Sequence, residues 1–271
     1  MNLSDIGPVV LVGAGKMGLA LARGWIAGGL PADRLVLCDP QPTDAARSFA
    51  VEHGVRLLDS PIGVLTHVLV LAVKPQVIYD VMAEIQPIVG SYTLVLSIAA
   101  GIPLVGLSEG LQTDRVIRTM PNTPAQIGRG ITGAVGLAVS GEDRATADKL
   151  LSAAGDVMWF EDEAMIDAVT AVSGSGPAYV FYMVEALSAA ARRQGFDEDQ
   201  AMQLARATVT GAAALMDADP TPAATLRENV TSPNGTTAAA LGVLMGADGM
   251  EPLLDRAVSA ARLRSEELGR G

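Results

Sequence analysis

The sequence has little of the chemistry that most metal and nucleophilic sites require. Its 271 residues include one cysteine, Cys38, and two histidines, His53 and His67. A single cysteine excludes a disulfide framework within the chain and a cysteine-based metal site. Aromatic residues make up only 4% of a chain that is 49% hydrophobic, so aliphatic side chains must fill the core. The composition therefore indicates closely packed helices and buried strands, and no metal site is expected.

Basic charge and long apolar runs are also scarce. Lysine and arginine number 19 against 30 acidic residues, a net charge of −11, which argues against nucleic acid or an anionic membrane as partner. No apolar run reaches the roughly 20 residues of a membrane-spanning helix without charge or Gly/Pro breaks. Asp5, Gly7 and Pro8 interrupt the N-terminal stretch, so no secretory signal is expected there. We expect a soluble, cytoplasmic protein.

The first forty residues have the order of a dinucleotide-binding unit. A β-branched run at 8–12 leads into Gly13-Ala14-Gly15-Lys16-Met17-Gly18, a helical segment follows at 19–27, and a second apolar run at 35–38 closes on Asp39. A glycine turn between a strand and a helix, with an acidic residue about 20 positions further on, is typical of a Rossmann fold. We expect Gly13 to permit the tight turn, Gly15 to let the backbone approach a pyrophosphate, and Gly18 to let helix and strand pack closely.

Asp39 has two possible roles. At the end of the second strand, its carboxylate would accept hydrogen bonds from the ribose hydroxyls of NAD and repel the 2′-phosphate of NADP. Alternatively, it only begins a turn with Pro40, as Asp-Pro pairs often do.

Further apolar runs predict the remaining strands of the first half. They lie at 68–73, 93–98, 115–119, 133–139 and 157–160, with a helix at 144–154. Lys74-Pro75 and Ala99-Ala100-Gly101 end two of these runs, so they should lie with the glycine turn at the carboxyl edge of the sheet, where α/β ligands bind. Lys74 would contact a phosphate or the substrate there, or would simply be solvated.

From about residue 162 the strand patterns stop. The sequence predicts helices at 163–172, 178–194, 198–216, 226–230, 236–244 and 253–268. Ser173-Gly174-Ser175-Gly176 suits a cap or a tight turn, and Pro177 suits the first turn of the helix that follows. Because the helical faces are rich in alanine and glycine, we expect an obligate homodimer formed through these helices. The predicted domains are 1–162, which binds the dinucleotide, and 163–271, which is helical.

The segment Asn229 to Thr237 is unusual for a loop between helices. It combines Ser232, Gly235, Thr236 and Thr237 with a helix start, where backbone N–H groups are free to bind a carboxylate. Alternatively, Ser232 or Thr236 is an ordinary helix cap.

These segments together resemble the pyrroline-5-carboxylate reductase family over nearly the whole chain. The segments that carry the resemblance are the glycine turn, Ala72-Val73-Lys74-Pro75, Ala99-Ala100-Gly101, Arg115-Val116-Ile117-Arg118 with Met120-Pro121-Asn122-Thr123-Pro124, Ile166-Asp167-Ala168-Val169-Thr170, Ser173-Gly174-Ser175-Gly176-Pro177-Ala178-Tyr179, and Val230-Thr231-Ser232-Pro233. The resemblance implies a Rossmann domain followed by an all-α dimerisation domain. It also implies hydride transfer from NADPH or NADH to the cyclic imine of 1-pyrroline-5-carboxylate, giving L-proline.

The resemblance also implies positions for both ligands. The dinucleotide, NADP or NAD, is expected to contact Val12, Gly13, Ala14, Gly15, Lys16, Met17, Gly18, Asp39, Asp59, Ala72, Val73, Lys74, Pro75, Ile98, Ala99, Ala100 and Asn229. The imino acid is expected to contact Glu163, Ser232, Gly235, Thr236 and Thr237. We assign the substrate carboxylate to the N–H groups of Gly235 and Thr236. The Thr237 hydroxyl is the catalytic group, as an orienting hydrogen bond to the ring nitrogen rather than a strong acid.

Three positions depart from the family pattern. Asp39 stands where members that prefer NADPH often have a small hydroxyl residue, and Asp59 stands where asparagine is common. Asn234 replaces the first glycine of a usual Gly-Gly pair, although asparagine tolerates the left-handed conformation better than most residues. The first two positions put a preference for NADPH in question.

Two other functions remain possible on the sequence. A related β-hydroxyacid or imine reductase would act on another small carboxylate, but hydroxy-acid chemistry normally needs a lysine or histidine in the helical domain, and none occurs from residue 162 onward. A non-catalytic dinucleotide sensor would keep the glycine turn but has no need of the loop at 232–237.

Overall fold

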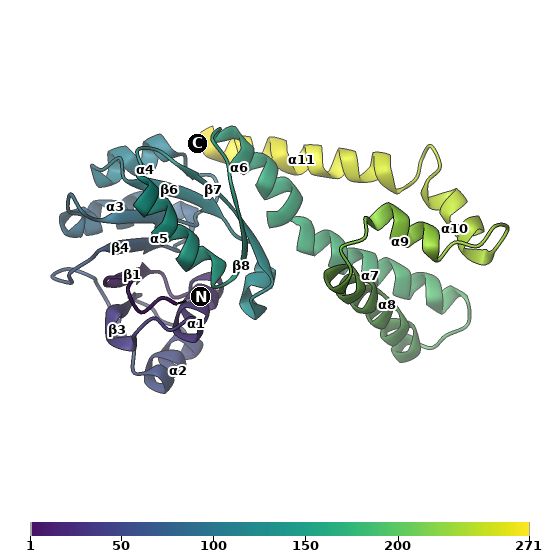
Figure 1. The fold of residues 1–271 in the computed structure, drawn as a ribbon, viewed down its shortest axis with the longest axis horizontal. Coiled ribbons are helices and arrows are strands. Elements are labelled where there is room, and N and C mark those ends of the chain that lie inside the picture. The colour runs from purple at the N-terminus through teal and green to yellow at the C-terminus, as the bar shows by residue number, and fades with distance from the viewer. Residues whose placement is uncertain (1, 271) are drawn as a thin grey trace. The chain divides into compact units, whose positions relative to one another are not determined.

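The computed structural model describes residues 2–270 and divides them into two compact units. The first unit contains the chain up to Ser175 together with the residues from Ala261 onward, and the second runs from Gly176 to Ala260. Figure 1 shows the sheet in the first unit and helices in the second. The α/β class and the all-α second part are as the sequence predicts.

The first unit is built on a sheet of eight strands within the described residues, in the order β3-β2-β1-β4-β5-β6-β7-β8. Strands β1 to β6 are parallel where they pair, β7 runs antiparallel to β6, and β8 is parallel to β7. The strands are β1 (Val9–Val12), β2 (Leu35–Cys38), β3 (Arg56–Leu58), β4 (Val68–Leu71), β5 (Leu94–Ser97), β6 (Val116–Met120), β7 (Gly130–Gly136) and β8 (Gly155–Trp159).

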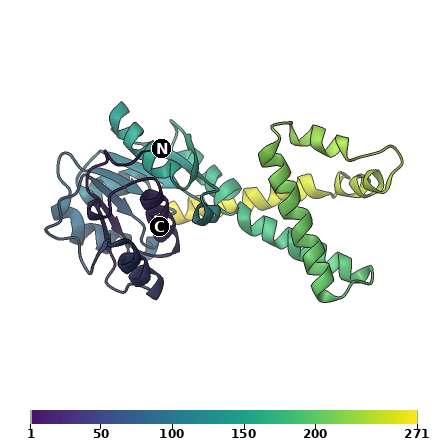
Figure 2. The same ribbon diagram turned by 60° about the horizontal axis from the view of Figure 1, so that its bottom comes forward.

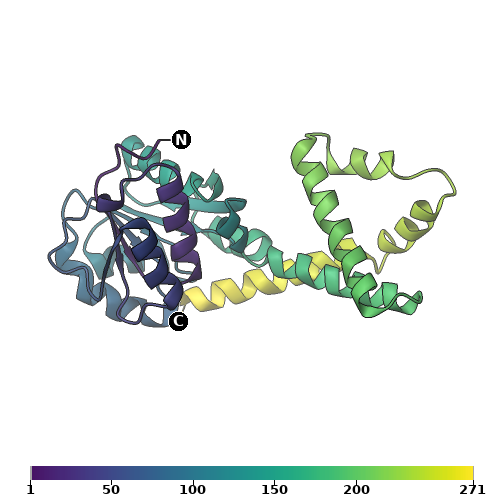
Figure 3. The same cartoon turned by 90° about the horizontal axis from the view of Figure 1, so that it is seen from below.

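Helices cover both faces of this sheet because its central strands are apolar on both sides. Val9 and Leu11 of β1 pack in one cluster with α1, α2 and α5, while Val10 and Val12 pack in another with α3 and α4. Figure 3 shows the purple helices α1 and α2 in front of the strands. The bounds are α1 (Lys16–Ala27), α2 (Asp44–His53), α3 (Ile78–Ile85), α4 (Leu104–Leu111), α5 (Gly141–Ser152) and α6 (Ala164–Val169).

The passage from the first unit to the second differs from the prediction. Thr170–Gly174 forms a π-helical turn, with the N–H of Ser175 donating to the carbonyl of Thr170 at 2.8 Å, and α7 follows at once. The cap or tight turn expected at Ser173–Gly176 is therefore wrong, because the chain stays helical from α6 into α7. Pro177 does lie in the first turn of α7.

The second unit is helical and has almost no apolar core of its own. It contains α7 (Gly176–Arg193), α8 (Glu198–Ala218), α9 (Ala223–Asn229), α10 (Thr236–Leu244) and the first half of α11 (Met250–Arg270). Helices α7 and α8 lie against each other (Figure 2). Among its described residues, the buried apolar side chains are Ala201 and Ala205, whereas Phe181 and Tyr182 are 62% and 70% exposed.

The compact units do not divide at the predicted domain boundary. Ile166 of α6 is buried with the β4 and β5 side chains, and α6 lies after residue 162. The boundary after residue 162 therefore stays a prediction of where dinucleotide binding ends and the dimerisation segment begins, whereas the first compact unit extends to Ser175.

Candidate cofactor and substrate sites

The glycine turn is tightly packed at two of its glycines and open at the third. Gly13 has φ +95°, and a Cβ there would lie 2.6 Å from the carbonyl oxygen of Ala72. A Cβ on Gly18 would lie 2.4 Å from the carbonyl oxygen of Gly13, so α1 packs directly on the turn. By contrast, a Cβ on the exposed Gly15 would meet no atom within 4 Å. The open space is therefore at the one glycine whose expected role is to leave room for a ligand.

The predicted cofactor segments gather at one edge of the sheet. The register pairs the last residues of β1, β2, β4 and β5, because Val12 is opposite both Cys38 and Leu71, and Leu71 is opposite Ser97. Hydrogen bonds continue this alignment past the strand ends: the N–H of Gly13 donates to Cys38 at 2.8 Å, and that of Ala72 donates to Val12 at 2.8 Å. The edge holds Val12 to Gly18, Asp39, Asp59, Ala72 to Pro75, and Ile98 to Ala100.

Asp39 is bound on both of its carboxylate oxygens. Oδ2 accepts the N–H of Ala14 at 2.9 Å, and Oδ1 accepts the N–H of Gln41 at 2.9 Å. The contact with Gln41 closes the turn at Pro40, which is the alternative role given above for Asp39. The contact with Ala14 ties the end of β2 to the glycine turn. Since each carboxylate oxygen has a second lone pair, ribose hydroxyls can still donate to Asp39. Asp59 follows β3, whose Leu58 is paired with Cys38, and is exposed beside this site.

The predicted substrate loop ends in an uncapped helix. Gly235 is the N-cap of α10, and no side chain caps this helix, so capping by Ser232 or Thr236 is not observed. Asn234 has φ +58°, the left-handed conformation that asparagine tolerates. A Cβ on Gly235 would lie 2.4 Å from Oγ of Ser232, which explains why glycine stands there.

One detail of the carboxylate assignment needs correction. The N–H of Gly235 donates to the carbonyl of Ser232 at 3.0 Å, so it is already engaged within the loop. The donors left for a carboxylate are the N–H groups of the first turn of α10, which have no intrahelical partners. Thr236 and Thr237 are the first two residues of that turn. Asn229 is the last residue of α9, before the loop.

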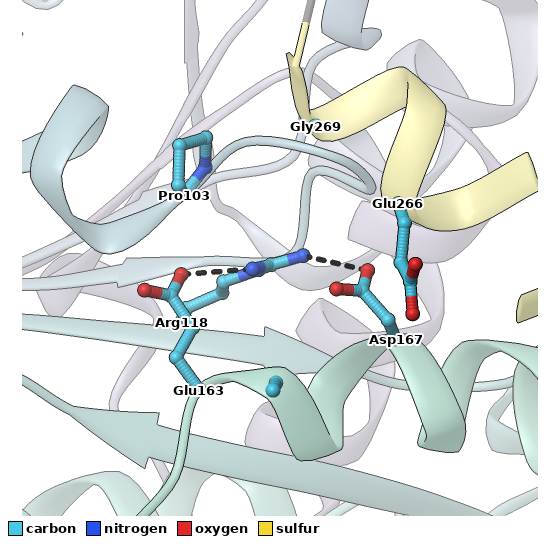
Figure 4. A pocket seen from close by; sticks show the side chains of 7 residues that line it. Pro103, Arg118, Glu163, Asp167, Glu266 and Gly269 are labelled. Carbon is cyan, nitrogen blue, oxygen red and sulfur yellow. Dashed lines mark hydrogen bonds and ion pairs between the residues drawn. The ribbon is translucent and has the colours of Figure 1, made fainter. Parts of the chain in front are cut away.

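Glu163 lies in the first unit, whereas the loop at 232–237 lies in the second. Its Oε1 accepts the N–H of Leu104 at 2.7 Å. The same oxygen accepts a hydrogen bond from Nη1 of Arg118 at 2.8 Å (Figure 4). Glu163 and Arg118 line a cavity of about 290 Å³, which is bounded by Pro103, Arg118, Glu163, Ala164, Asp167, Glu266 and Gly269.

Arg118 and Asp167 line this cavity and form an ion pair there, which the sequence analysis did not anticipate. Both stood in segments that carry the family resemblance, but neither was given a function. The available signal was a charged residue directly after the apolar Val116 and Ile117 of a predicted strand, since a buried arginine requires partners.

The described residues hold neither a metal-binding cluster nor a membrane span. No group of three or more His, Cys, Asp or Glu side chains in residues 2–270 is arranged to hold a metal ion. None of the helices in that range is long and apolar enough to cross a membrane.

Comparison with known proteins gives the family. Residues 163–268 match the family model described as pyrroline-5-carboxylate reductase dimerisation, and residues 8–101 match the one described as NADP oxidoreductase, coenzyme F420-dependent. The pyrroline-5-carboxylate reductase of Pseudomonas aeruginosa is 40% identical over 264 residues, which cover 96% of each chain. That of Pisum sativum is 37% identical over 98% of this chain and 97% of its own.

Solved structures agree. A pyrroline-5-carboxylate reductase from Coxiella burnetii is similar with a TM-score of 0.89 and 33% identity, covering 97% of this chain and 98% of that one. The Plasmodium falciparum enzyme, solved with NADP bound, has a TM-score of 0.81 and 26% identity over 97% of this chain and 98% of its own. The chain belongs to the pyrroline-5-carboxylate reductase family.

Proposed function

We propose that this chain reduces the cyclic imine of 1-pyrroline-5-carboxylate to L-proline with hydride from NADPH or NADH. The observation that carries the proposal is 40% identity, over 96% of both chains, to a protein named for this reaction. The aligned strand ends supply a dinucleotide edge, and the uncapped start of α10 supplies donors for a carboxylate.

The reaction asks little of side-chain chemistry. When bound, the reduced dinucleotide would supply the hydride for the imine carbon, and the protonated ring nitrogen would take up the electron pair of the C=N bond. No metal or covalent nucleophile is needed, since the cofactor carries the chemistry and the protein supplies proximity and orientation. The N–H groups at the start of α10 hold the substrate carboxylate, and the hydroxyl of Thr237 orients the ring nitrogen. Thr237 is thus the catalytic residue of the proposal.

The remaining site assignments are proposed together. The edge segments named above hold NADP or NAD, with Asn229 near the nicotinamide, while Glu163, Ser232, Gly235 and Thr236 border the imino acid. The free N–H groups of α10 support this assignment, because a helix N-terminus favours a bound anion.

The second unit supports a homodimer. Because its buried apolar side chains are two alanines while Phe181 and Tyr182 are largely exposed, these helices require a partner to complete a core. We infer that two copies pair through residues 163–271, while residues 1–162 bind the dinucleotide. The cytoplasm is the compartment we propose, since the single cysteine is buried and unpaired.

The test is the oxidation of NADPH and of NADH at 340 nm with 1-pyrroline-5-carboxylate, beside the same assay with small 2-hydroxy and 3-hydroxy acids and NAD(P). Turnover with the imine alone is expected. Turnover with a hydroxy acid alone would indicate a related dehydrogenase. Tight dinucleotide binding without turnover of any substrate would indicate a sensor.

A further inference from the structure

Arg118 is the one residue of β6 whose burial is costly. It lies between Ile117 and Thr119, and 5% of its surface is exposed. Removing a guanidinium from water costs several kcal/mol, so a buried arginine persists only when other groups compensate its charge. Nη1 donates to Oε1 of Glu163 at 2.8 Å, and Nη2 lies 3.5 Å from Oδ1 of Asp167. Its Nε has no hydrogen-bond partner among the described residues.

The two carboxylates extend this contact to separate segments of the first unit (Figure 4). Oε1 of Glu163 also accepts the N–H of Leu104 at 2.7 Å, and Leu104 is the first residue of α4. Oδ1 of Asp167 accepts the hydroxyl of Ser265, on the end of α11, at 2.6 Å. One guanidinium therefore connects the middle of the sheet with the start of α4, with α6 and with the end of α11.

The segment that these contacts fasten is the loop after β5. It runs from Ile98 to Pro103 and passes directly into Leu104. Gly101 in this loop has φ +74°, and a Cβ there would lie 3.2 Å from Cβ of Leu268 on α11. The loop is thus held at its far end by the Glu163 carboxylate, and at Gly101 it lies close to the end of α11, which Asp167 holds through Ser265.

We propose that Arg118 is a positioning residue that sets the loop Ile98–Pro103 for dinucleotide binding, acting through the Glu163 carboxylate on the N–H of Leu104. The inference rests on the proposed function in one respect, that Ile98, Ala99 and Ala100 contact the cofactor. With Arg118 in place, Glu163 and Asp167 face a common cation. Without it, two carboxylates lose their shared partner, Glu163 turns towards solvent, and the N–H of Leu104 loses its acceptor.

The chain offers a control directly before the same strand. Arg115 immediately precedes β6 and forms an ion pair with Asp143, in which Nε donates to Oδ2 at 3.4 Å. In this pair the carboxylate is buried and the arginine side chain is 32% exposed. This ion pair touches the N-terminus of α5 and not the loop after β5. Arg115→Gln therefore removes an arginine–carboxylate pair with one buried partner, as Arg118→Gln does, while leaving the Leu104 contact intact.

The experiment compares Arg118→Gln with Arg115→Gln in the full chain. Calorimetry without substrate gives the Kd of NADPH and of NADH, and thermal melting gives Tm. Arg118→Gln is expected to raise both Kd values about 10-fold or more, because small displacements of positioning groups are costly. Arg115→Gln is expected to lower Tm but keep each Kd within about twofold, and Arg118→Lys is expected to fall between Arg118→Gln and wild type.

Two outcomes would overturn the proposal: unchanged Kd values in a folded Arg118→Gln, or an equal rise in Arg115→Gln. If Arg118→Gln does not fold, Glu163→Ala removes the acceptor of the Leu104 N–H and must raise the same Kd values, or the proposal fails. Because Kd is measured without substrate, a wild-type protein that binds dinucleotide but reduces no pyrroline-5-carboxylate would refute the proposed function and still decide the role of Arg118.

Discussion

Replacing Asp39 by serine is expected to shift cofactor use towards NADPH. In the wild type, the half-buried Asp39 carboxylate stands at the end of β2, and Asp59 lies beside it at the end of β3. The loop at 39–46 contains no lysine or arginine. A 2′-phosphate placed on the adenosine ribose here meets carboxylates without a cation on that loop to offset them. We therefore propose that wild type uses NADH at least as well as NADPH.

The size of the effect follows from charge and distance. At roughly 5 Å and an effective dielectric constant of about 20, one like-charge contact costs on the order of 3 kcal/mol before screening. Solvent and salt around a half-exposed carboxylate reduce this to about half, and 1.4 kcal/mol corresponds to about tenfold. The ratio of kcat/KM for NADPH to that for NADH is thus expected to rise about tenfold in Asp39→Ser.

The structure adds a second effect that must be separated from charge. Asp39 accepts the N–H groups of Ala14 and Gln41, both at 2.9 Å, so serine also weakens the glycine turn. That loss acts on both cofactors alike, because both carry the same pyrophosphate. Asp39→Asn is the matched control, since it removes the charge and keeps one acceptor oxygen. Asp39→Ser and Asp39→Asn should change the ratio equally and differ in the absolute kcat/KM values.

The assay is steady-state oxidation at 340 nm with each cofactor at saturating pyrroline-5-carboxylate. A strong preference for NADPH in the wild type, unchanged in both variants, would show that Asp39 only holds the turn. An equal loss of kcat/KM with both cofactors, without a change in the ratio of NADPH to NADH, would also show that Asp39 only holds the turn.

Three further predictions concern the substrate, the assembly and acid stability. Thr237→Ala is expected to keep dinucleotide affinity and to lower kcat 10-fold or more, about 1.4 kcal/mol of transition-state stabilisation; kcat within about twofold of wild type would remove Thr237 from the mechanism. The chain is expected to be dimeric in light scattering at micromolar concentration because Phe181 and Tyr182 are exposed, and a monomer that melts cooperatively would contradict this. Burial by itself raises the pKa of Asp143, but hydrogen bonds, first that from Arg115, hold this pKa below its usual value. The ionised Asp143 therefore stabilises the folded state above the pKa that this residue has in the unfolded chain, and the stabilisation is lost as pH falls through the pKa in the folded protein. Tm should consequently fall more steeply in acid for wild type than for Arg115→Gln, and equal slopes would refute this prediction.

The central part of the fold was predictable because its signals are local. Uninterrupted apolar runs mark β2 and β4, and the bounds of β2 match the prediction at both ends. Since parallel strands end at one edge, the gathering of Gly13, Asp39, Ala72 and Ile98 followed from the strand order. β3 was not predicted, because it is three residues long and begins with an exposed Arg56. Nor does an apolar run reveal direction, so the antiparallel β7 needed the structure.

The candidate site was less predictable where its contacts are long-range. Arg118 and Glu163 are 45 residues apart in sequence, and no spacing rule connects a strand residue with the residue before a helix. The N–H of Gly235 was assigned wrongly for a different, local reason, because a turn hydrogen bond to the carbonyl of Ser232 engages a donor that the sequence leaves available. The turn expected at Ser173–Gly176 failed for a local reason too, since small residues suit both a turn and a π-helical segment.

The last prediction uses the glycine turn to separate binding from folding. Gly18→Ala places a methyl group 2.4 Å from the carbonyl oxygen of Gly13, and such overpacking is expected to cost about 1–3 kcal/mol of unfolding free energy. Gly15→Ala places its methyl group where no atom lies within 4 Å, and Gly15 does not need a positive φ, since its φ is −75°. The stability cost of Gly15→Ala is that of a poorer N-cap residue, below about 1 kcal/mol.

Dinucleotide binding should be weakened more by Gly15→Ala than by Gly18→Ala, the reverse of the order expected for stability. The new methyl group of Gly15→Ala projects into the open space at the start of α1, which a pyrophosphate must enter to reach the N–H groups there. The Kd of either dinucleotide is expected to rise at least about 10-fold, or 1.4 kcal/mol, while Tm stays close to wild type. Gly18→Ala should lower Tm more than Gly15→Ala does. A Gly15→Ala protein that binds both cofactors as tightly as wild type would mean that the pyrophosphate does not approach this glycine, and the assignment of the turn would then fail even though the fold is correct.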